Sequence, residues 1–242
     1  MALIEVQNLT KTYGKKSSAY TALKGINLEI ERGESIAIIG KSGSGKSTLM
    51  HLMALLDSPT KGQINLSEKS TNKLKPREVD DLRNEKFGFV FQQFYLNPRD
   101  SVINNVMLPL EIAGIDRPDR KRRALDALAT VDLVEKAKNK ATDLSGGQKQ
   151  RVCIARALVN NPEVIFADEP TGNLDSINGE KIEDLLFKLN KEKGITLIIV
   201  THDSDLAKRC DRQIHLKDGQ IVDREKYIKE DNDKHDRKGA EK

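Results

Sequence analysis

Tryptophan is absent from this chain of 242 residues, and cysteine is scarce, with Cys153 and Cys210 as its only two. The two cysteines lie in different predicted elements and form no CxxC pair, so neither a disulfide nor a metal site is predicted. We expect two reduced thiols that pack in the interior of the protein.

Long apolar runs are also missing. The longest, at 35–39, 164–167 and 197–200, fall far short of the ~18 residues that a membrane-spanning helix needs. Met1–Glu5 lacks the basic start and apolar stretch of a signal peptide, which predicts a cytosolic chain. The net charge of +4 is spread along the sequence and is too weak to indicate a nucleic-acid partner.

The composition that remains is that of a soluble globular protein, with 37% hydrophobic and 32% charged residues. At roughly 150 residues per domain, the length predicts one large domain or one domain with an inserted lobe. We expect residues 1–223 to form that domain. Residues 224–242 are highly charged and are expected to form a flexible tail.

Hydrophobic periodicity predicts an α/β fold. Residues 2–9 and 23–30 alternate between apolar and polar, which is typical of half-exposed antiparallel strands. Short apolar runs rich in β-branched or aromatic residues predict parallel strands buried on both faces, at 35–39, 87–91, 164–168 and 196–200. Helical periods follow at 46–56, 177–192 and 203–209. The pattern predicts a mostly parallel sheet behind an N-terminal antiparallel β layer.

The strand pattern disappears between about 93 and 160. Residues 117–132 and 147–160 are instead typical of helices, so this stretch is interpreted as a helical subdomain inserted into the α/β core. Further on, 213–222 is predicted to be a hairpin, because Asp218-Gly219 suits a tight turn.

The residues from Gly40 to Ser47 match GxxxxGK[ST] between a predicted buried strand and a predicted helix, which is the context of a phosphate-binding P-loop. Glycines let successive N–H groups face an anion, and the start of the helix adds about half a positive charge. Lys46 is expected to bridge the β- and γ-phosphates and Ser47 to ligate Mg²⁺. The candidate phosphate-binding residues are Gly40, Ser42, Gly43, Ser44, Gly45, Lys46, Ser47 and Thr48.

Two further segments suit the same chemistry. The strand at 164–168 ends in Asp168-Glu169, where Asp168 is expected to hold Mg²⁺ through water and Glu169 to deprotonate an attacking water. Ahead of a predicted helix stands Leu-Ser-Gly-Gly-Gln, and the hydroxyl, free N–H groups and helix dipole at this start predict a second anion site. Its residues are Ser145, Gly146, Gly147 and Gln148. A simple N-cap with flexible glycines is the alternative.

A P-loop, LSGGQ, a strand ending in Asp-Glu and a later histidine, in this order, resemble the nucleotide-binding domain of an ATP-binding cassette (ABC) transporter. The resemblance implies roles for four more residues. Tyr13 matches the aromatic that stacks on adenine, and Gln92 the glutamine that senses Mg²⁺ and the γ-phosphate. Asp175 matches a loop that communicates between two sites, and His202 the switch histidine at the γ-phosphate.

The resemblance also implies ligands and partners. Expected ligands are ATP and Mg²⁺, and expected partners are a second copy of the chain and an integral membrane permease. The ATPase would then lie at the inner face of the cell membrane. The segment Phe94–Leu96 matches a groove for the membrane subunit. Asp168–Ser176 is most similar to the subgroup of lipoprotein release, macrolide and peptide efflux, and antimicrobial-peptide resistance.

Other functions stay open at this point. A cell-division ATPase of the same subgroup, which regulates cell-wall hydrolysis without transport, has the same motifs. A soluble cassette acting on ribosomes or DNA fits less well, because the chain has a single cassette and no long heptad run. An amino-acid importer matches the Asp168–Ser176 segment less closely. No motif identifies the transported substrate.

Overall fold

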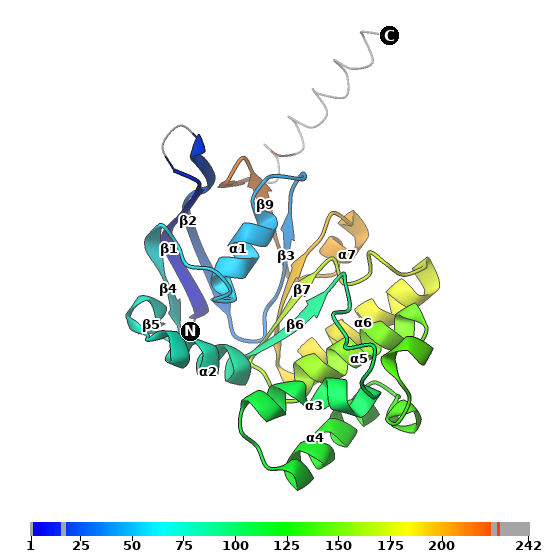
Figure 1. Ribbon diagram of the computed structural model, residues 1–242. Coiled ribbons are helices and arrows are strands. Elements are labelled where there is room, and N and C mark those ends of the chain that lie inside the picture. Colours follow the sequence, from blue (N-terminus) through cyan, green and yellow to red (C-terminus); the bar gives the residue numbers. More distant parts are fainter. Residues whose placement is uncertain (1, 16–17, 224–226, 228–242) are drawn as a thin grey trace, which may run out of the picture.

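The computed structural model describes residues 2–15, 18–223 and 227, and it contains two β-sheets (Figure 1). The antiparallel sheet has the strand order β2-β1-β4-β5. Its strands are β1 (Ala2–Tyr13), β2 (Tyr20–Glu31), β4 (Lys61–Leu66) and β5 (Lys69–Ser70). β1 and β2 confirm the predicted N-terminal antiparallel layer.

The second sheet has the order β10-β9-β3-β8-β7-β6 and is parallel except for the pair formed by β9 and β10. Its strands are β3 (Ser35–Ile39), β6 (Phe87–Phe91), β7 (Val164–Asp168), β8 (Thr196–Val200), β9 (Arg212–Lys217) and β10 (Gln220–Val222). The four buried strands have the predicted bounds. The predicted tail, 224–242, lies outside the described residues except for Tyr227.

Alternate side chains of the parallel strands enter two different hydrophobic cores. In β7, Val164 and Phe166 belong to the core shared with the antiparallel sheet, whereas Ile165 and Ala167 belong to the core under the C-terminal helices. β8 alternates in the same way. This is why these strands are continuous apolar runs: each face of the sheet is covered.

Helices cover both faces. α1 (Lys46–Met53) lies between the two sheets, and α5 (Gly146–Leu158), α6 (Ser176–Lys193) and α7 (Ser204–Lys208) lie on the opposite face (Figure 1). α3 (Val102–Ile112) and α4 (Arg117–Thr130) pack on α5, as the inserted helical segment predicts. Short 3-10 turns complete this region, η3 (Val134–Lys136) and η4 (Ala141–Asp143). Within the described ranges, no helix has both the length and the apolar character that a bilayer span requires.

One stretch carried no prediction, and it contains β4, β5, η2 (Thr71–Lys73) and α2 (Pro76–Lys86). α2 has no buried residue, so it shows no apolar period from which a helix is recognised. It begins instead with Pro76 at its first turn and with Glu78, whose carboxylate accepts from the Lys75 N–H at 2.7 Å.

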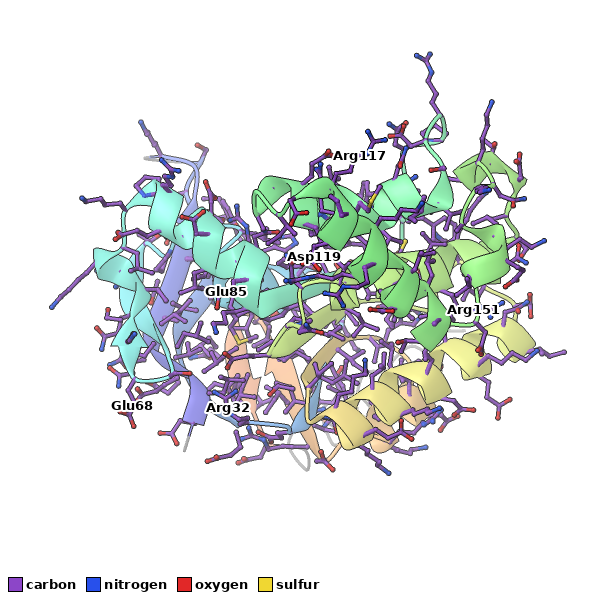
Figure 2. All side chains as sticks on the ribbon, turned by 90° about the horizontal axis from the view of Figure 1, so that it is seen from below. Arg32, Glu68, Glu85, Arg117, Asp119 and Arg151 are labelled. Atoms are coloured by element: carbon purple, nitrogen blue, oxygen red, sulfur yellow. The ribbon has the colours of Figure 1, made fainter. Side chains whose placement is uncertain are left out.

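A chain of ion pairs joins the amino ends of the central strands. Glu163 precedes β7 and contacts Arg32 at 2.6 Å and Lys86 at 2.8 Å, and Lys86 also contacts Glu85 at 2.9 Å. Arg32 and Glu85 are labelled in Figure 2. These charged contacts hold the amino ends of the strands together. The loops that follow the strands lie at the opposite, carboxyl edge of the sheet.

Phe166 is the side chain whose removal tests the core most directly. It is completely buried and packs edge-on against Phe87 at 5.2 Å between ring centroids and stacked on Phe89 at 5.9 Å. We expect Phe166→Ala to lower the free energy of unfolding by about 3–5 kcal/mol, as for other buried aromatic truncations. Urea unfolding measures it. Ile112→Ala, which truncates an exposed side chain, is the control and should change stability by less than about 0.5 kcal/mol.

Candidate functional site

The predicted P-loop runs from the end of β3 to the first turn of α1, at the carboxyl edge of the parallel sheet. Two glycines are required by its shape. A Cβ on Gly40 would lie 2.3 Å from the carbonyl oxygen of Leu216, and Gly45 has φ +103° with its Cβ position 2.7 Å from the carbonyl oxygen of Ala22. The loop is therefore wound tightly between β2 and β9.

The start of α1 is suited to bind a phosphate. Gly45 is its N-cap and has no side chain to accept from the first-turn N–H groups, which belong to Lys46, Ser47 and Thr48. The Lys46 ammonium lies over the loop and donates to the carbonyl oxygens of Gly40 at 2.8 Å and Lys41 at 3.2 Å. The hydroxyl of Ser44 is buried and has no hydrogen-bond partner among the described residues. The first-turn N–H groups and the Ser44 hydroxyl are thus available to donate to the oxygens of a triphosphate.

Asp168 is the last residue of β7 and Glu169 follows it at the same edge, and β8 lies between β7 and the P-loop strand β3. Partial burial raises the pKa of Asp168, and the neighbouring Glu169 raises it further, while His51 and Lys46 act in the opposite direction. A bound cation would offset the cost of burying the charged form of this carboxyl. Ser47, Gln92 and Asp168 are the residues predicted to hold Mg²⁺.

Glu169 has φ +45°, a left-handed conformation that is rare for a side chain of this kind. One carboxylate oxygen accepts from the His202 N–H at 3.1 Å and lies 2.8 Å from the Nδ1 of the same residue. The other oxygen accepts from the Thr201 hydroxyl at 3.2 Å. The two residues predicted to act on water and γ-phosphate are thus in direct contact, and Thr201 is a partner that sequence reasoning missed.

Gln92 follows β6 and is exposed beside the loop after β7. Its carbonyl oxygen accepts from Asn173 Nδ2 at 2.8 Å, and its own Nε2 donates weakly to Asn173 Oδ1 at 3.4 Å. Gly172 leaves room for this contact, because a Cβ there would lie 2.8 Å from Gln92 Nε2. Gln92 is therefore held mainly through its backbone carbonyl, and its exposed side chain is held only by the long contact with Asn173.

The LSGGQ segment begins α5 with a capping box. Ser145 Oγ accepts from the Gln148 N–H at 3.3 Å, and Gln148 Oε1 accepts from the Ser145 N–H at 3.0 Å. Ser145 is therefore an N-cap, and the N–H groups of Gly146 and Gly147 in the first turn have no intrahelical partner, which is what the predicted anion site would require. The segment forms these contacts within itself and not with the P-loop.

Asp175 connects this segment to the loop after β7. It caps α6, where it accepts from the Asn178 backbone at 3.0 Å and side chain at 2.7 Å, and these bonds lower its pKa. Asn178 in turn lies against Gly147, where an added Cβ would be 2.9 Å from Asn178 Oδ1. The starts of α5 and α6 are therefore packed together.

Tyr13 is 42% exposed at the end of β1. Its hydroxyl donates to Asp57 at 3.0 Å, and the ammonium of Lys11 lies 4.9 Å from the centre of its ring. Directly opposite on β2 stands Tyr20, whose hydroxyl donates to the P-loop carbonyl of Gly43 at 3.3 Å. Tyr13 is thus a fixed ring close to the P-loop, and Tyr20 is a second aromatic that the sequence analysis did not select.

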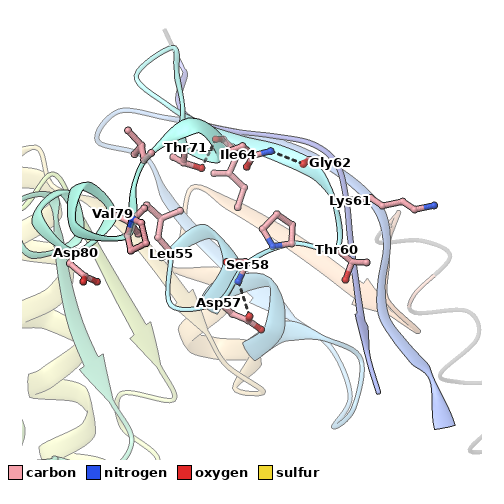
Figure 3. A pocket seen from close by; sticks show the side chains of 14 residues that line it. Leu55, Asp57, Ser58, Thr60, Lys61, Gly62, Ile64, Thr71, Val79 and Asp80 are labelled. Carbon is pink, nitrogen blue, oxygen red and sulfur yellow. Dashed lines mark hydrogen bonds between the residues drawn. The ribbon is translucent and has the colours of Figure 1, made fainter. Parts of the chain in front are cut away.

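Asp57 also borders a separate hollow of about 580 Å³ between the end of α1, β4 and α2 (Figure 3). Two hydrogen bonds join residues of its wall. The Thr71 hydroxyl donates to the carbonyl of Ile64 at 2.8 Å, and the Asn72 side chain donates to the carbonyl of Gly62 at 3.0 Å. None of the predicted site residues lines this hollow.

A second hollow, of about 490 Å³, lies between β6 and the helices α2 and α3. Tyr95, Leu108 and Ile112 are exposed apolar side chains on its wall. The Tyr95 ring is held edge-on by Phe91 at 5.5 Å, and its carbonyl accepts from Arg156 at 2.8 Å. Of the predicted segment Phe94–Leu96, Tyr95 faces this hollow, while Leu96 packs on the core.

Residues 23–172 match the family model described as ABC transporter. An ABC transporter ATP-binding protein of Methanocaldococcus jannaschii is 47% identical over 93% of this chain and 97% of its own length. The lipoprotein-releasing system ATP-binding protein LolD of Bacteroides fragilis is 46% identical over 91% and 100%. The macrolide export ATP-binding/permease protein MacB of Chlorobaculum tepidum is 48% identical over 91% of this chain but 34% of its own length.

Solved structures agree. A dimeric structure of the Methanocaldococcus cassette aligns with a TM-score of 0.83 at 46% identity, covering 91% of this chain and 97% of the other. A dimeric post-hydrolysis state of that cassette, bound to ADP and Pi, aligns with a TM-score of 0.82 at the same identity and coverage. The chain belongs to the ABC transporter family. It is an ATP-binding cassette ATPase with a P-loop NTPase fold, which confirms the fold class and the family resemblance.

Tyr13→Ala tests whether the exposed ring is the platform for the base. We expect it to weaken ATP binding by about 1–3 kcal/mol, the range for stacking of a base on an aromatic ring. Stacking through a ring face discriminates little between purines, so GTP should still bind. Titration with a fluorescent nucleotide measures both affinities. Tyr13→Phe keeps the ring and is expected to bind like the native protein; equal affinity of the Ala variant would show Tyr13 to be an ordinary surface residue.

Proposed function

We propose that this chain hydrolyses ATP as one half of a head-to-tail dimer and so drives export or extraction of a substrate by a separate membrane subunit. One observation carries the proposal: the chain has two helix starts with free N–H groups, at α1 and α5, on separate elements. Each suits a phosphate, and within the described part of the chain no hydrogen bond joins the residues of one start to those of the other. In a dimer, the ATP bound to the P-loop of a second copy would be the ligand of the α5 start.

The P-loop binds the triphosphate in this proposal. The N–H groups of the α1 first turn and the Ser44 hydroxyl face the phosphate oxygens, and Lys46 turns from the carbonyls of Gly40 and Lys41 to the β- and γ-phosphates. Mg²⁺, when bound, supplies charge neutralisation of the phosphates. Ser47, Asp168 and Gln92 are the residues that would hold it.

Glu169 is the general base in this proposal, and His202 contacts the γ-phosphate. Their mutual contact of 2.8 Å and the Thr201 hydrogen bond fix the carboxylate at the end of β7. A water in line with the γ-phosphate transfers its proton to Glu169. A positioned base of this kind contributes about 10²–10⁴-fold in rate.

The second anion site receives the γ-phosphate bound to the partner's P-loop. In a two-fold symmetric dimer both chains use the same surface, so two identical sites form, each made from the P-loop of one chain and the α5 start of the other. Ser145, Gly146, Gly147 and Gln148 belong to that surface, and Asp175, which is packed beside them, carries changes from one site to the other. The dimeric relatives, one of them with ADP and Pi, support this arrangement.

The membrane partner docks in the hollow beside Tyr95. An exposed apolar wall next to the nucleotide-sensing Gln92 suits a coupling surface. The lipoprotein-releasing and macrolide-export functions named for the relatives support an export or extraction role. In this proposal the ATPase lies on the inner face of the cell membrane. A regulatory cell-division ATPase is the alternative, and identification of the copurifying membrane protein separates the two.

Glu169→Gln is the variant that isolates the dimer. The amide keeps the shape and a hydrogen bond but does not take a proton, so ATP binds without being hydrolysed. We expect this variant to accumulate with ATP as a dimer of roughly twice the 27.1 kDa monomer mass, measured by light scattering.

The control adds Ser145→Arg, which places a bulky side chain at the partner's phosphate. The double variant should stay monomeric with ATP while it still binds nucleotide through Lys46. Dimers of the double variant, or a Glu169→Gln protein that remains monomeric at saturating ATP, would contradict the composite site.

Tyr95→Glu tests the docking surface. A carboxylate in the apolar wall opposes burial against a partner helix, since an unpaired charge is costly to bury. We expect the copurifying membrane subunit to be lost in a pull-down while nucleotide affinity is unchanged. Thr130→Glu, on the far helix α4, serves as the matched control. Recovery of the membrane subunit at native levels with Tyr95→Glu would exclude this surface.

A further inference from the structure

Gln150 is a polar side chain in the helix that begins with LSGGQ, and it is completely buried. Its amide Nε2 donates to two backbone carbonyls, that of Phe91 at 3.2 Å and that of Pro170 at 2.6 Å. Both of its N–H groups are thus used, and both acceptors come from other elements. One side chain ties α5 to the ends of β6 and β7.

The two carbonyls adjoin residues with proposed roles in ATP hydrolysis. Phe91 directly precedes Gln92, and Pro170 directly follows Glu169. Asn173 holds Gln92 from the other side by donating to its carbonyl at 2.8 Å. The direction of the Glu169 side chain depends on a backbone with φ +45°, and Gln150 is bound to the next residue.

The buried amide is also an energetic cost to the fold. Its Oε1 has no hydrogen-bond partner among the residues that the structure describes. A buried acceptor without a partner destabilises a protein, and a methionine of similar length would not carry one. Methionine would, however, leave the carbonyls of Phe91 and Pro170 without this donor. What the position requires is therefore a side chain that donates twice, even though one acceptor stays unpaired.

We infer that Gln150 is a positioning residue, which sets the spacing between Gln92 and Glu169 and couples both to the start of α5. This inference rests on the proposed ATPase roles of those two residues. Gln150 is completely buried and acts through the backbone of the two loops. ATP hydrolysis should therefore depend on it while ATP binding at the P-loop should not.

Gln150→Met removes both donors and retains the length of the side chain. We expect kcat for ATP hydrolysis to fall about 10- to 100-fold, because small misplacements of reacting groups carry losses of that size. KM for ATP should stay within about twofold, since the P-loop contacts are unchanged. Gln150→Asn keeps the amide but is one methylene shorter, so it should lose less. Rates are expressed per nucleotide-binding chain, which removes any contribution from misfolded protein.

Asn190 provides a matched control on the other edge of the sheet. It is 6% exposed, and its Nδ2 likewise bridges two backbone carbonyls, those of Gly33 and Ile195, at 2.8 Å each. Asn190→Leu should lower Tm at least as much as Gln150→Met does, yet leave kcat within about twofold. If both variants lower Tm but only Gln150→Met lowers kcat, the loss of activity does not come from lost stability. A merely structural role of Gln150 would not produce this result.

Two outcomes would overturn the inference. In one, Gln150→Met keeps its kcat; in the other, kcat falls equally in Gln150→Met and Asn190→Leu. Failure of the proposed function is recognised separately, because it requires that the native protein does not hydrolyse ATP or that Glu169→Gln remains active.

Discussion

The uncapped start of α1 is the feature around which the rest of the site is arranged. Gly45 lacks a side chain to accept from the first-turn N–H groups, so these donors and the helix dipole stay available for an anion. The strand before it is buried on both faces and holds the loop in place. The parallel strands β8 and β7 lie on one side of it and end at the same edge of the sheet, which places Asp168, Glu169 and His202 on the edge that carries the P-loop.

The start of α5, among the inserted helices, also has first-turn N–H groups that could donate to an anion. Its first turn is capped by Ser145 but retains the N–H groups of two glycines, which pack against α6 without a side chain of their own. In the proposed dimer, the ATP bound to one chain is the ligand for the α5 start of the other. Dimer formation, hydrolysis and release of products would then be one cycle, because the ligand that joins the chains is also the substrate.

Much of the fold was predictable because burial on both faces leaves a clear pattern. The strands β3, β6, β7 and β8 were predicted at their observed bounds, since each is a short apolar run. α2 was missed because it buries nothing and so shows no apolar period; its remaining signals are local ones at its start, Pro76 and Glu78. The P-loop and LSGGQ were recognisable from residue type and spacing.

Other parts of the site depend on contacts that a sequence does not display. Threonine is a common residue type, and nothing in the sequence marks Thr201 as a site residue. Its hydroxyl matters because β8 ends beside Glu169. The same holds for Tyr20, which meets Gly43 through the register of β1 and β2. Gln150 looks like an ordinary polar helix residue until its two acceptors are seen.

The central claim is that each ATP is hydrolysed between the P-loop of one chain and the α5 start of the other. Mixing two inactive variants tests it most directly: Lys46→Ala, which lacks the P-loop lysine, and Ser145→Arg, which blocks the second site. In a mixed dimer one site combines both defects and the other combines neither. An equal mixture should therefore regain up to about a quarter of the native ATPase activity, since half of the dimers are mixed and each has one intact site. If the mixture stays inactive although mixed dimers form, the two motifs do not act across chains and the account is wrong.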